Sequence, residues 1–496
     1  MQISKSDYMM LLKHPAWLWM KKHDPKKLPS IDANLQARFD EGHNYEPYAE
    51  QLFPDGVTLG WDPKKYGSYN QLLDKTTSEL EKDTKVIFQG RFISGQLTFI
   101  FDIIEKLDDG SFNLYEVKAT TTAKDEHYPD LSFQQLVMEQ LGYTINNIYV
   151  VHLNNKYVRK GAINIKELSE ITNVTDKVKA LKPVTEDRVI DALKIMQQPT
   201  MPDPSPRHVG LGKKKDWMEI FRRLKPNLPE YSIYDLAGRN GGAVAYMENK
   251  DKLLIEDIPE DLKISGEKAK NQIAVTKKDR AIVIKPKIKQ FLDELEFPLY
   301  FLDYEAFSKA VPVYNGNKPY QQVVFQYSVH ILDSPDAELL HEMYLHTDDS
   351  NPIEPLAEHM MDKISDKGSV IVWHHVYERD RNREMAAMSG KHSSFFENLN
   401  ERMIDLEIPF QKDWYVVKEF KGSSSIKAVL PVLVPELSYK ELKIQDGLTT
   451  GRVWVETVID GQHEGKQEAM FEQMRKYNTL DTLAMVEIYK KLIAAL

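Results

Sequence analysis

Two short stretches, far apart in the chain, decide the fold of its C-terminal part. The first, Tyr300-Phe301-Leu302-Asp303-Tyr304-Glu305, is an apolar run that ends in two carboxylates one residue apart. Side chains at i and i+2 of a strand share a face, so Asp303 and Glu305 would project together from a buried strand. The second, Tyr477-Asn478-Thr479-Leu480-Asp481, places a phenol and a carboxylate four residues apart, on one face of a helix. Three carboxylates and a phenol suit a site for two divalent cations, the kind of site that cleaves phosphodiesters.

Length and composition indicate a soluble, multidomain protein. The chain has 496 residues, which predicts about three domains at roughly 150 residues each. Hydrophobic residues make up 42% and charged residues 28%, the proportions of a globular protein. The net charge of −10 does not favour a generic polyanion-binding surface, but a nuclease can confine its basic residues to one groove beside an acidic metal site.

What the sequence lacks excludes several classes of protein. It has no run of about twenty apolar residues, so we expect no membrane span. Residues 1–7 show no apolar core of a signal peptide. The count of zero cysteines excludes disulfides, thiolate zinc sites and cysteine-ligated iron–sulfur clusters. A cytoplasmic protein is the simplest interpretation.

The order of patterns along the chain predicts three parts. In residues 1–225 we expect a helix at 131–142, a hairpin turn at 108–111, and strands at 86–88, 97–104, 112–117 and 147–153. Prolines, glycines and lysines between about 183 and 230 predict a loop-rich stretch. Residues 226–290 are expected to form a small helical connector. Beyond a helix at 285–295, strands and helices alternate through residues 291–496, which predicts an α/β layer fold.

A second set of charged residues lies in the N-terminal part. Asp102 sits in the apolar stretch 99–104, and Glu116 and Lys118 share a face of the strand across the expected hairpin. Paired strands would bring Asp102 next to Glu116, and the two can bind Mg²⁺ through oxygen ligands. Lys118 would then orient the metal-bound water or stabilise charge on a phosphate. The competing interpretation is a solvated strand edge.

These residues resemble the RecB-like branch of the PD-(D/E)XK nucleases, which includes the CRISPR-associated exonucleases. The resemblance covers residues 85–160 and rests on Asp102, Glu116, Lys118 and a helix glutamine, Gln134. It implies a restriction-endonuclease-like core. Many members of the branch also carry an iron–sulfur cluster held by cysteines, which this chain lacks.

Upstream, residues 41–50 resemble the first helix of that branch, which donates a glutamate and sometimes a histidine to the metal. Glu46 and Glu50 are both candidates, and the residues do not separate them. His43 is a candidate metal ligand, with a surface or capping role as the alternative.

The C-terminal stretches resemble the DnaQ-like (DEDD) exonucleases, which have an RNase H-like fold. Asp303 and Glu305 fit the first motif of that family. Tyr477 and Asp481 fit its third motif, in which the tyrosine positions the attacking water and the aspartate binds metal.

The second motif of the family should follow another buried strand. The stretch 370–373 is such a strand, and Glu378 after it would be the carboxylate, where the family more often has aspartate. A glutamate reaches one methylene further, so the metal geometry would change. Asp405, near the end of a later strand, has a supporting or ligating role.

The whole arrangement resembles a bacterial family known only as a domain of unknown function. Between the DEDD-like motifs the stretch 422–427 is a turn of small residues that ends in a lysine at a helix start. That composition suits the approach of the backbone to a phosphate. A plain loop before a capped helix is the alternative.

We therefore expect a bifunctional nuclease that uses Mg²⁺ or Mn²⁺ to activate water for attack on a phosphodiester. The resemblances favour DNA over RNA, single strands as substrate, and 3′→5′ polarity for the C-terminal module. The lack of a long apolar run predicts no membrane partner.

Two other classes of function compete with this interpretation. Glu378 in the second motif and the absent cysteines favour a nucleic-acid-binding or scaffolding protein with one inactive nuclease module. A metal-dependent hydrolase of small phosphoesters is the other class.

Overall fold

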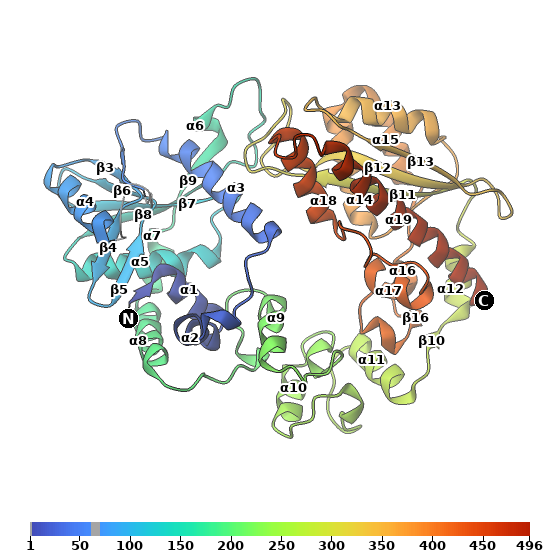
Figure 1. Cartoon of the computed structure of the whole chain (residues 1–496), viewed down its shortest axis with the longest axis horizontal. Helices are drawn as coiled ribbons and strands as arrows, with labels where there is room; N and C mark the ends of the chain where they lie inside the picture. Colours follow the sequence, from blue (N-terminus) through green and yellow to red (C-terminus); the bar gives the residue numbers. More distant parts are fainter. Residues whose placement is uncertain (1, 61–69) are drawn as a thin grey trace. The chain divides into compact units, whose positions relative to one another are not determined.

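The chain forms two compact units, each built from mixed sheets and helices (Figure 1). The computed structural model describes residues 2–60 and 70–496. Unit 1 comprises Met1–Asn227 and Lys309–Tyr320, and unit 2 comprises Leu228–Ser308 and Gln321–Leu496. The mixed α/β class is thus confirmed, whereas the division into three domains stays a prediction. None of the helices in the described ranges is both long and apolar enough to cross a membrane.

Unit 1 is built on a sheet of six strands. Their order is β2 (Val57–Thr58), β3 (Val86–Phe88), β6 (Ile103–Lys106), β7 (Phe112–Lys118), β8 (Ile145–Leu153) and β9 (Ser169–Asn173). The hairpin β6–β7 is antiparallel and β8 runs parallel to β7. A smaller sheet joins β1 (Ile3–Ser4), β5 (Leu97–Ile100) and β4 (Arg91–Ser94).

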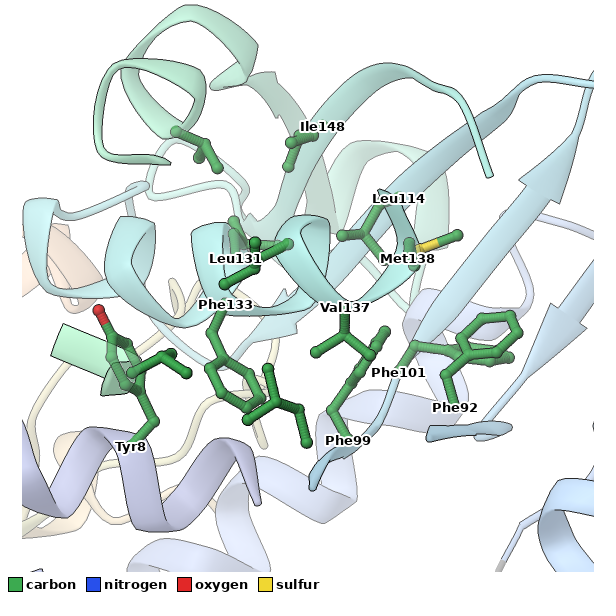
Figure 2. Packing of buried hydrophobic residues seen from close by; sticks show 14 of the residues in the cluster. Tyr8, Phe92, Phe99, Phe101, Leu114, Leu131, Phe133, Val137, Met138 and Ile148 are labelled. Atoms are coloured by element: carbon green, nitrogen blue, oxygen red, sulfur yellow. The ribbon is translucent and has the colours of Figure 1, made fainter. Parts of the chain in front are cut away.

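One helix, α5 (Tyr128–Gln140), links β7 to β8 and carries the main core of unit 1 (Figure 2). Its apolar side chains pack with Leu114 of β7 and with Phe99 and Phe101. Tyr8 stacks on Phe133 of α5 with ring centroids 5.1 Å apart. The other helices of the unit are α1 (Lys5–Lys13), α2 (Pro15–His23), α3 (Ala33–Glu50), α4 (Asn70–Glu81), α6 (Ile165–Leu168), α7 (Thr175–Ala180), α8 (Lys182–Gln197) and α9 (Lys214–Leu224).

The start of α1 is held by its own sequence and by α2. Ser4 and Asp7 form a capping box, in which each side chain accepts the backbone N–H of the other residue. The buried Asp7 carboxylate also pairs with Lys21 at 2.8 Å and Lys22 at 2.5 Å. The first helical residue, Lys5, therefore has a defined position beside β5.

Three details of unit 1 differ from the sequence-based expectations. The strand expected at 97–104 is broken at Phe101 and Asp102, because the chain leaves the small sheet there to enter the large one. The helix expected at 131–142 begins at Tyr128, with Pro129 in its first turn, where a proline costs no hydrogen bond. The stretch expected to be loop-rich from about 183 instead continues α8 to Gln197.

Unit 2 contains a five-stranded sheet with the predicted carboxylate strand at its centre. The order is β13 (Leu340–Leu345), β12 (Val323–Leu332), β11 (Leu299–Phe307), β14 (Ser369–Val372) and β15 (Met403–Asp405). β11, β12 and β13 are antiparallel, and β14 and β15 run parallel to β11. The strands expected at 299–303 and 370–373 are confirmed.

Helices α18 (Gly447–Trp454) and α19 (Gln467–Ala494) pack against β11. The Trp454 ring stacks on Phe307 and Phe325, each at 4.8 Å, and its indole N–H donates to the His346 carbonyl. The other helices of unit 2 are α10 (Gly241–Glu248), α11 (Glu267–Lys278), α12 (Lys285–Leu292), α13 (Ile353–Lys363), α14 (His375–Met388), α15 (Ser393–Glu401), α16 (Ile408–Gln411) and α17 (Ile426–Leu433). Two short strands, β10 (Ile282–Val283) and β16 (Tyr415–Val416), pair beside α16.

Candidate functional sites

Three carboxylates of unit 2 meet where α19 crosses β11. Asp303 and Glu305 project from β11 and Asp481 from α19, and one oxygen of each lies within 4.8 Å of the others. The ladder between β11 and β12 shifts register directly after Glu305. Such irregularities often re-aim side chains next to functional sites. The structure thus brings together the carboxylates that the two motifs predicted.

Polar side chains near the trio hold the acids in place. Asn478 donates to Asp303 Oδ2 at 2.6 Å, and the Tyr439 hydroxyl donates to Asp481 Oδ1 at 2.5 Å. Tyr477 is buried one helical turn before Asp481, with its ring 6.0 Å from that of Tyr439. The predicted Tyr477 therefore hydrogen-bonds Asp481, as does Tyr439, which the sequence did not single out.

The electrostatics of this trio favour a cation. Burial, and then the charge of Asp481, raises the pKa of Asp303 well above its ordinary value. Burial and the neighbouring acids raise the pKa of Glu305 in the same way, and burial raises the pKa of Asp481 to about 6. A divalent cation would replace the mutual repulsion with attraction, because carboxylate oxygens are the ligands that Mg²⁺ prefers.

Glu378 lies in the first turn of α14, close to the trio but outside it. Its side chain is 3% exposed, and its Oε2 atom has no hydrogen-bond partner. Burial, followed by the charge of Asp303, raises the pKa of Glu378 well above the ordinary value. A buried acceptor without a partner is costly. Together with the trio, it fits a site that binds a divalent metal ion.

Asp405, at the end of β15, supports the start of α14. It accepts the backbone N–H groups of His374 and His375 at 3.0 and 3.2 Å, and His375 Nδ1 lies 2.7 Å from the same carboxylate. His374 has a φ of +70°, a conformation that needs such support in a residue other than glycine. Of the two roles left open, the contacts of Asp405 match the supporting one.

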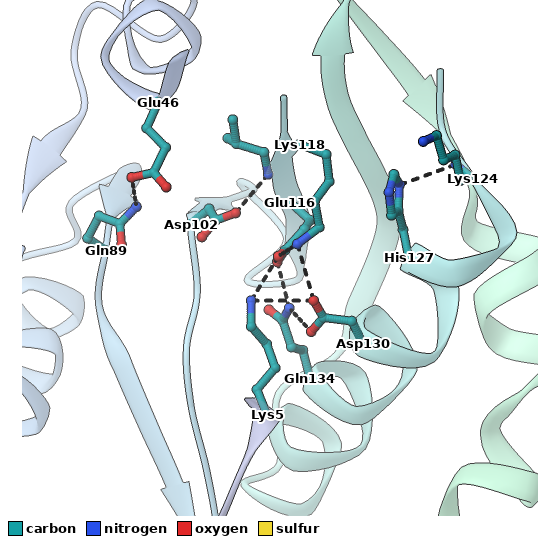
Figure 3. Close-up of polar contacts among 11 residues, drawn as sticks. Lys5, Glu46, Gln89, Asp102, Glu116, Lys118, Lys124, His127, Asp130 and Gln134 are labelled. Carbon is teal, nitrogen blue, oxygen red and sulfur yellow. Dashed lines mark hydrogen bonds and ion pairs between the residues drawn. The ribbon is translucent and has the colours of Figure 1, made fainter. Parts of the chain in front are cut away.

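In unit 1, the buried Glu116 lies at the centre of a charged cluster (Figure 3). Its Oε1 atom accepts from Lys118 Nζ at 2.5 Å and from Lys5 Nζ at 2.8 Å, and its Oε2 atom accepts from Gln134 at 2.6 Å. Asp130 lies 3.3 Å from Lys118 and accepts from Gln134 at 3.1 Å. Burial opposes ionisation of Glu116, but the charges of Lys118 and Lys5 outweigh it and lower the pKa of this carboxyl.

Asp102 joins this cluster from the break between β5 and β6. Its Oδ2 atom accepts the backbone N–H of Val117 at 2.8 Å, so the carboxylate sits beside β7, as expected. Burial and the charge of Glu116 raise the pKa of Asp102 to about 7. The Asp102 carboxylate is therefore close enough to Glu116 for the two charges to act on each other, as expected of two ligands of one cation.

On α3, the structure separates the two candidate glutamates. Glu46 accepts from Gln89 at 3.3 Å, and burial, with the charge of Glu116 among the causes, raises its pKa. Glu50 instead accepts from Thr58 at 3.3 Å. Glu46 is therefore the residue that faces the cluster. His43 is exposed one turn before Glu46, and its charge lowers the pKa of Glu46.

Two members of the unit 1 cluster were missed in the sequence. Asp130 is four residues before Gln134, a spacing on one helix face that would have found it. Lys5 gives no such signal, because 111 residues separate it from Glu116. Elsewhere in the described ranges, Glu354, Glu358 and His392 form another group with metal-ligand spacing. Lys391 already neutralises that group, with Nζ 3.2 and 2.7 Å from the two glutamates.

Comparisons with known proteins connect the chain to bacterial sequences of unknown function. Residues 300–425 match a family described as a domain of unknown function (DUF2779). The uncharacterized protein UU173 of Ureaplasma parvum is 25% identical over 356 residues, which cover 66% of this chain and 50% of that protein. The uncharacterized MG366 homolog of Mycoplasma pneumoniae is 23% identical over 229 residues, 42% of this chain and 34% of that protein. The chain thus spans half or less of the length of these relatives. The predicted resemblance to a bacterial domain of unknown function is confirmed at this coarser level.

Proposed function

We propose that the protein is a metal-dependent nuclease with two hydrolytic modules, and that unit 2 degrades single-stranded DNA from its 3′ end. The observation that carries the proposal is the meeting of Asp303, Glu305 and Asp481 within 4.8 Å at a buried crossing of strand and helix. A cluster of raised carboxyl pKa values in one place is a feature of functional sites more than of structural ones.

In unit 2, each residue has a role in the proposed hydrolysis. Asp303, Glu305 and Asp481 would hold Mg²⁺ or Mn²⁺, and Glu378 would complete the set from α14. When bound, the metal supplies a nucleophilic water and stabilises charge on the phosphate. Tyr477 would orient the attacking water, while Tyr439 holds the Asp481 carboxylate. The central β11, with an antiparallel pair of strands on one side and parallel strands on the other, supports the expected RNase H-like fold.

In unit 1, the proposed metal ligands are Asp102, Glu116 and Glu46, with His43 as a further candidate. Lys118 would stabilise charge on the phosphate, and Gln134 would fix the orientation of Glu116. The hairpin β6–β7 followed by α5 and the parallel β8 supports the expected PD-(D/E)XK core. No iron–sulfur cluster is part of the proposal, since the chain has zero cysteines.

One observation favours the alternative of a single inactive module. Both Lys5 and Lys118 pair with Glu116, so the charge of this carboxylate is already balanced by the protein. Unit 1 would then bind nucleic acid without cutting it.

The proposal is tested with a 5′-labelled single-stranded oligonucleotide in Mn²⁺. Wild type should shorten it from the 3′ end, and Asp303→Asn should slow this about a thousandfold, the effect of losing several kcal/mol of transition-state stabilisation. Asp336→Asn, an exposed change in the same unit, is the matched control.

The variant Asp102→Asn tests unit 1. If its cleavage products are the same as those of wild type, the alternative of an inactive unit 1 module is supported. A wild type that leaves the oligonucleotide intact but hydrolyses nucleotides would replace the proposal with a small-phosphoester hydrolase.

A further inference from the structure

The turn that leads into α17 places a lysine beside the carboxylates of unit 2. Lys421 and Gly422 both have positive φ angles, +51° and +75°, so the chain reverses direction sharply here. A Cβ at Gly422 would lie 1.9 Å from the side-chain nitrogen of Gln272, so any larger residue would have to displace that side chain and would be strained at this positive φ. Helix α17 then begins at Ile426, and Lys427 is its second residue.

The Lys427 ammonium lies over the two tyrosines of the site. Its Nζ atom is 5.3 Å from the ring centroid of Tyr477 and 5.6 Å from that of Tyr439, and it donates to the Gln445 carbonyl at 2.7 Å. These are distances of cation–π contact. The ammonium is also close enough to the carboxylate trio for its positive charge to oppose the rise in the pKa of Asp303, Glu305 and Asp481.

This lysine has no acidic partner of its own. Within residues 2–60 and 70–496, no carboxylate oxygen lies within 4.0 Å of Lys427 Nζ, and its hydrogen bond goes to a neutral carbonyl. Lys421, on the same turn, is instead paired with Glu230. The side chain of Lys427 is exposed and lines an open pocket together with Glu419, Phe420 and Ser423, and the three acids of the trio are not among its lining residues. An ammonium with unused N–H donors, next to buried acids and reachable from solvent, is suited to bind an anion.

We propose that Lys427 binds a non-bridging oxygen of the scissile phosphodiester in unit 2. The inference rests on the proposed nuclease function and assigns a residue to its substrate. The metal ions of the proposed site would offset part of the repulsion between the carboxylates and a phosphodiester, and an ammonium beside them adds positive charge from the protein. Lysine supplies it as a point charge, and the same charge stabilises the phosphate as negative charge builds up in the transition state. The tyrosine rings beneath the ammonium fix its position without neutralising it.

A purely structural role for Lys427 makes a different prediction. If the ammonium only offsets the repulsion among the acids, its removal should unsettle the trio and weaken metal binding. If it contacts the phosphate, its removal should weaken nucleic-acid binding and cleavage, whereas Mn²⁺ should bind as tightly as before or more tightly, because a competing cation has gone.

The test compares Lys427→Met and Lys427→Arg with wild type, with Lys440→Met as an exposed control in the following segment. Mn²⁺ affinity is measured by calorimetry, and binding of a single-stranded oligonucleotide with a 3′-terminal phosphorothioate is measured in Ca²⁺, where turnover is not needed. kcat and KM are measured in Mn²⁺. We expect Lys427→Met to lower kcat/KM about a hundredfold and to weaken oligonucleotide binding about tenfold, with Mn²⁺ affinity kept and with partial rescue by Lys427→Arg.

Two results would overturn the inference: Lys427→Met that binds and cleaves the oligonucleotide like wild type, or a loss of oligonucleotide binding that merely follows a loss of Mn²⁺ binding. Failure of the proposed function is distinct, because wild type itself would then not cleave. The binding measurements in Ca²⁺ would still decide whether Lys427 contacts the phosphate.

Discussion

The two acidic sites differ in how their buried carboxylates are surrounded and in the direction in which the carboxyl pKa values are shifted. In unit 1, Glu116 is surrounded by two ammonium groups and an amide, and its pKa is lowered. In unit 2, Asp303 and Glu305 face one another and Asp481, and the pKa values of all three are raised. The Glu116 carboxylate is thus balanced by lysines of the protein itself, whereas the carboxylates of the unit 2 trio raise one another's pKa and, in the proposed site, would be balanced by a cation from solution.

The largest expected effect is on the free energy of unfolding when one negative charge is removed from each site. The change should destabilise unit 1 and stabilise unit 2. Glu116→Gln removes the nearest anion of Lys5 and Lys118 and leaves them only Asp130, at 3.6 and 3.3 Å. We expect unit 1 to lose about 3 kcal/mol, the low end of the cost of breaking a buried pair, since Asp130 keeps part of the pairing. Asp481→Asn at pH 8 without metal should stabilise unit 2 by up to about 3 kcal/mol, since ionising a carboxyl whose pKa is about 6 rather than 3.8 costs roughly that much.

Hydrogen exchange, read separately on peptides from α5 and α19, measures the stability of each unit. Glu126→Gln and Asp336→Asn, both exposed, are the matched controls. Equal destabilisation by Glu116→Gln and Asp481→Asn would contradict the contrast between the two sites.

A second expectation concerns pH and metal together. Burial raises the pKa of Asp481 to about 6 and also raises the pKa values of Asp303 and Glu305. Without metal, the folded state of unit 2 therefore holds more protons than the unfolded state at pH values between the ordinary carboxyl pKa near 4 and these raised ones. Stability should therefore fall as the pH rises through this window. Mn²⁺ displaces these protons, so its affinity should increase as the pH rises through the same window. At one hundred times its dissociation constant, Mn²⁺ should add about 2.7 kcal/mol to the free energy of unfolding.

Thermal unfolding at several pH values, with and without Mn²⁺, checks this prediction. Hydrogen exchange on α19 peptides reads unit 2 by itself, and there the variant Asp303→Asn/Glu305→Gln/Asp481→Asn should lose most of the gain from metal. It should keep only the part of the pH-dependent loss that comes from the raised pKa of Glu378. A wild-type gain from Mn²⁺ that shrank as the pH rose would contradict the proposed ligand set.

The smallest expected effect tests how exactly Glu305 is placed. Gly447 is the first residue of α18, and a Cβ there would lie 3.2 Å from Glu305 Oε2, closer than ordinary contact. Gly447→Ala should displace this carboxylate by a few tenths of an ångström and weaken Mn²⁺ binding about tenfold. Gly241→Ala is the matched control, because Gly241 also begins a helix and its Cβ would meet nothing within 4 Å. Calorimetry with Mn²⁺ compares the two variants, and equal affinities would show that Glu305 is not a ligand.

Much of this comparison could be predicted from local patterns. The period of two placed Asp303 and Glu305 on one face of a strand, and the spacing of four placed Tyr477 and Asp481 on one face of a helix. The hairpin that brings Asp102 beside Glu116 was predicted from its turn residues. These inferences involve residues close in sequence, where backbone geometry alone sets which side chains share a face.

Residues brought in from distant segments could not be predicted in this way. Tyr439 hydrogen-bonds Asp481 from 42 residues away, and Lys5 reaches Glu116 from 111 residues away. Neither residue belongs to a periodic pattern, and Lys5 reads in the sequence as an ordinary polar residue at a helix start. The break at Asp102 was also missed, because the apolar run continues through it while the chain changes sheets.

The sequence by itself determined which residues carry the acidic and basic groups, which of them share a face of one element, and which chemistry those groups permit. Only the tertiary structure decided how the charges are balanced. Distances of a few ångströms between segments far apart in the chain decide the state of a buried carboxylate. They decide whether it holds a proton, pairs with a lysine or is suited to bind a cation. Those distances are set by how β7 packs with α1 and α5, and how β11 packs with α19 and the turn before α17.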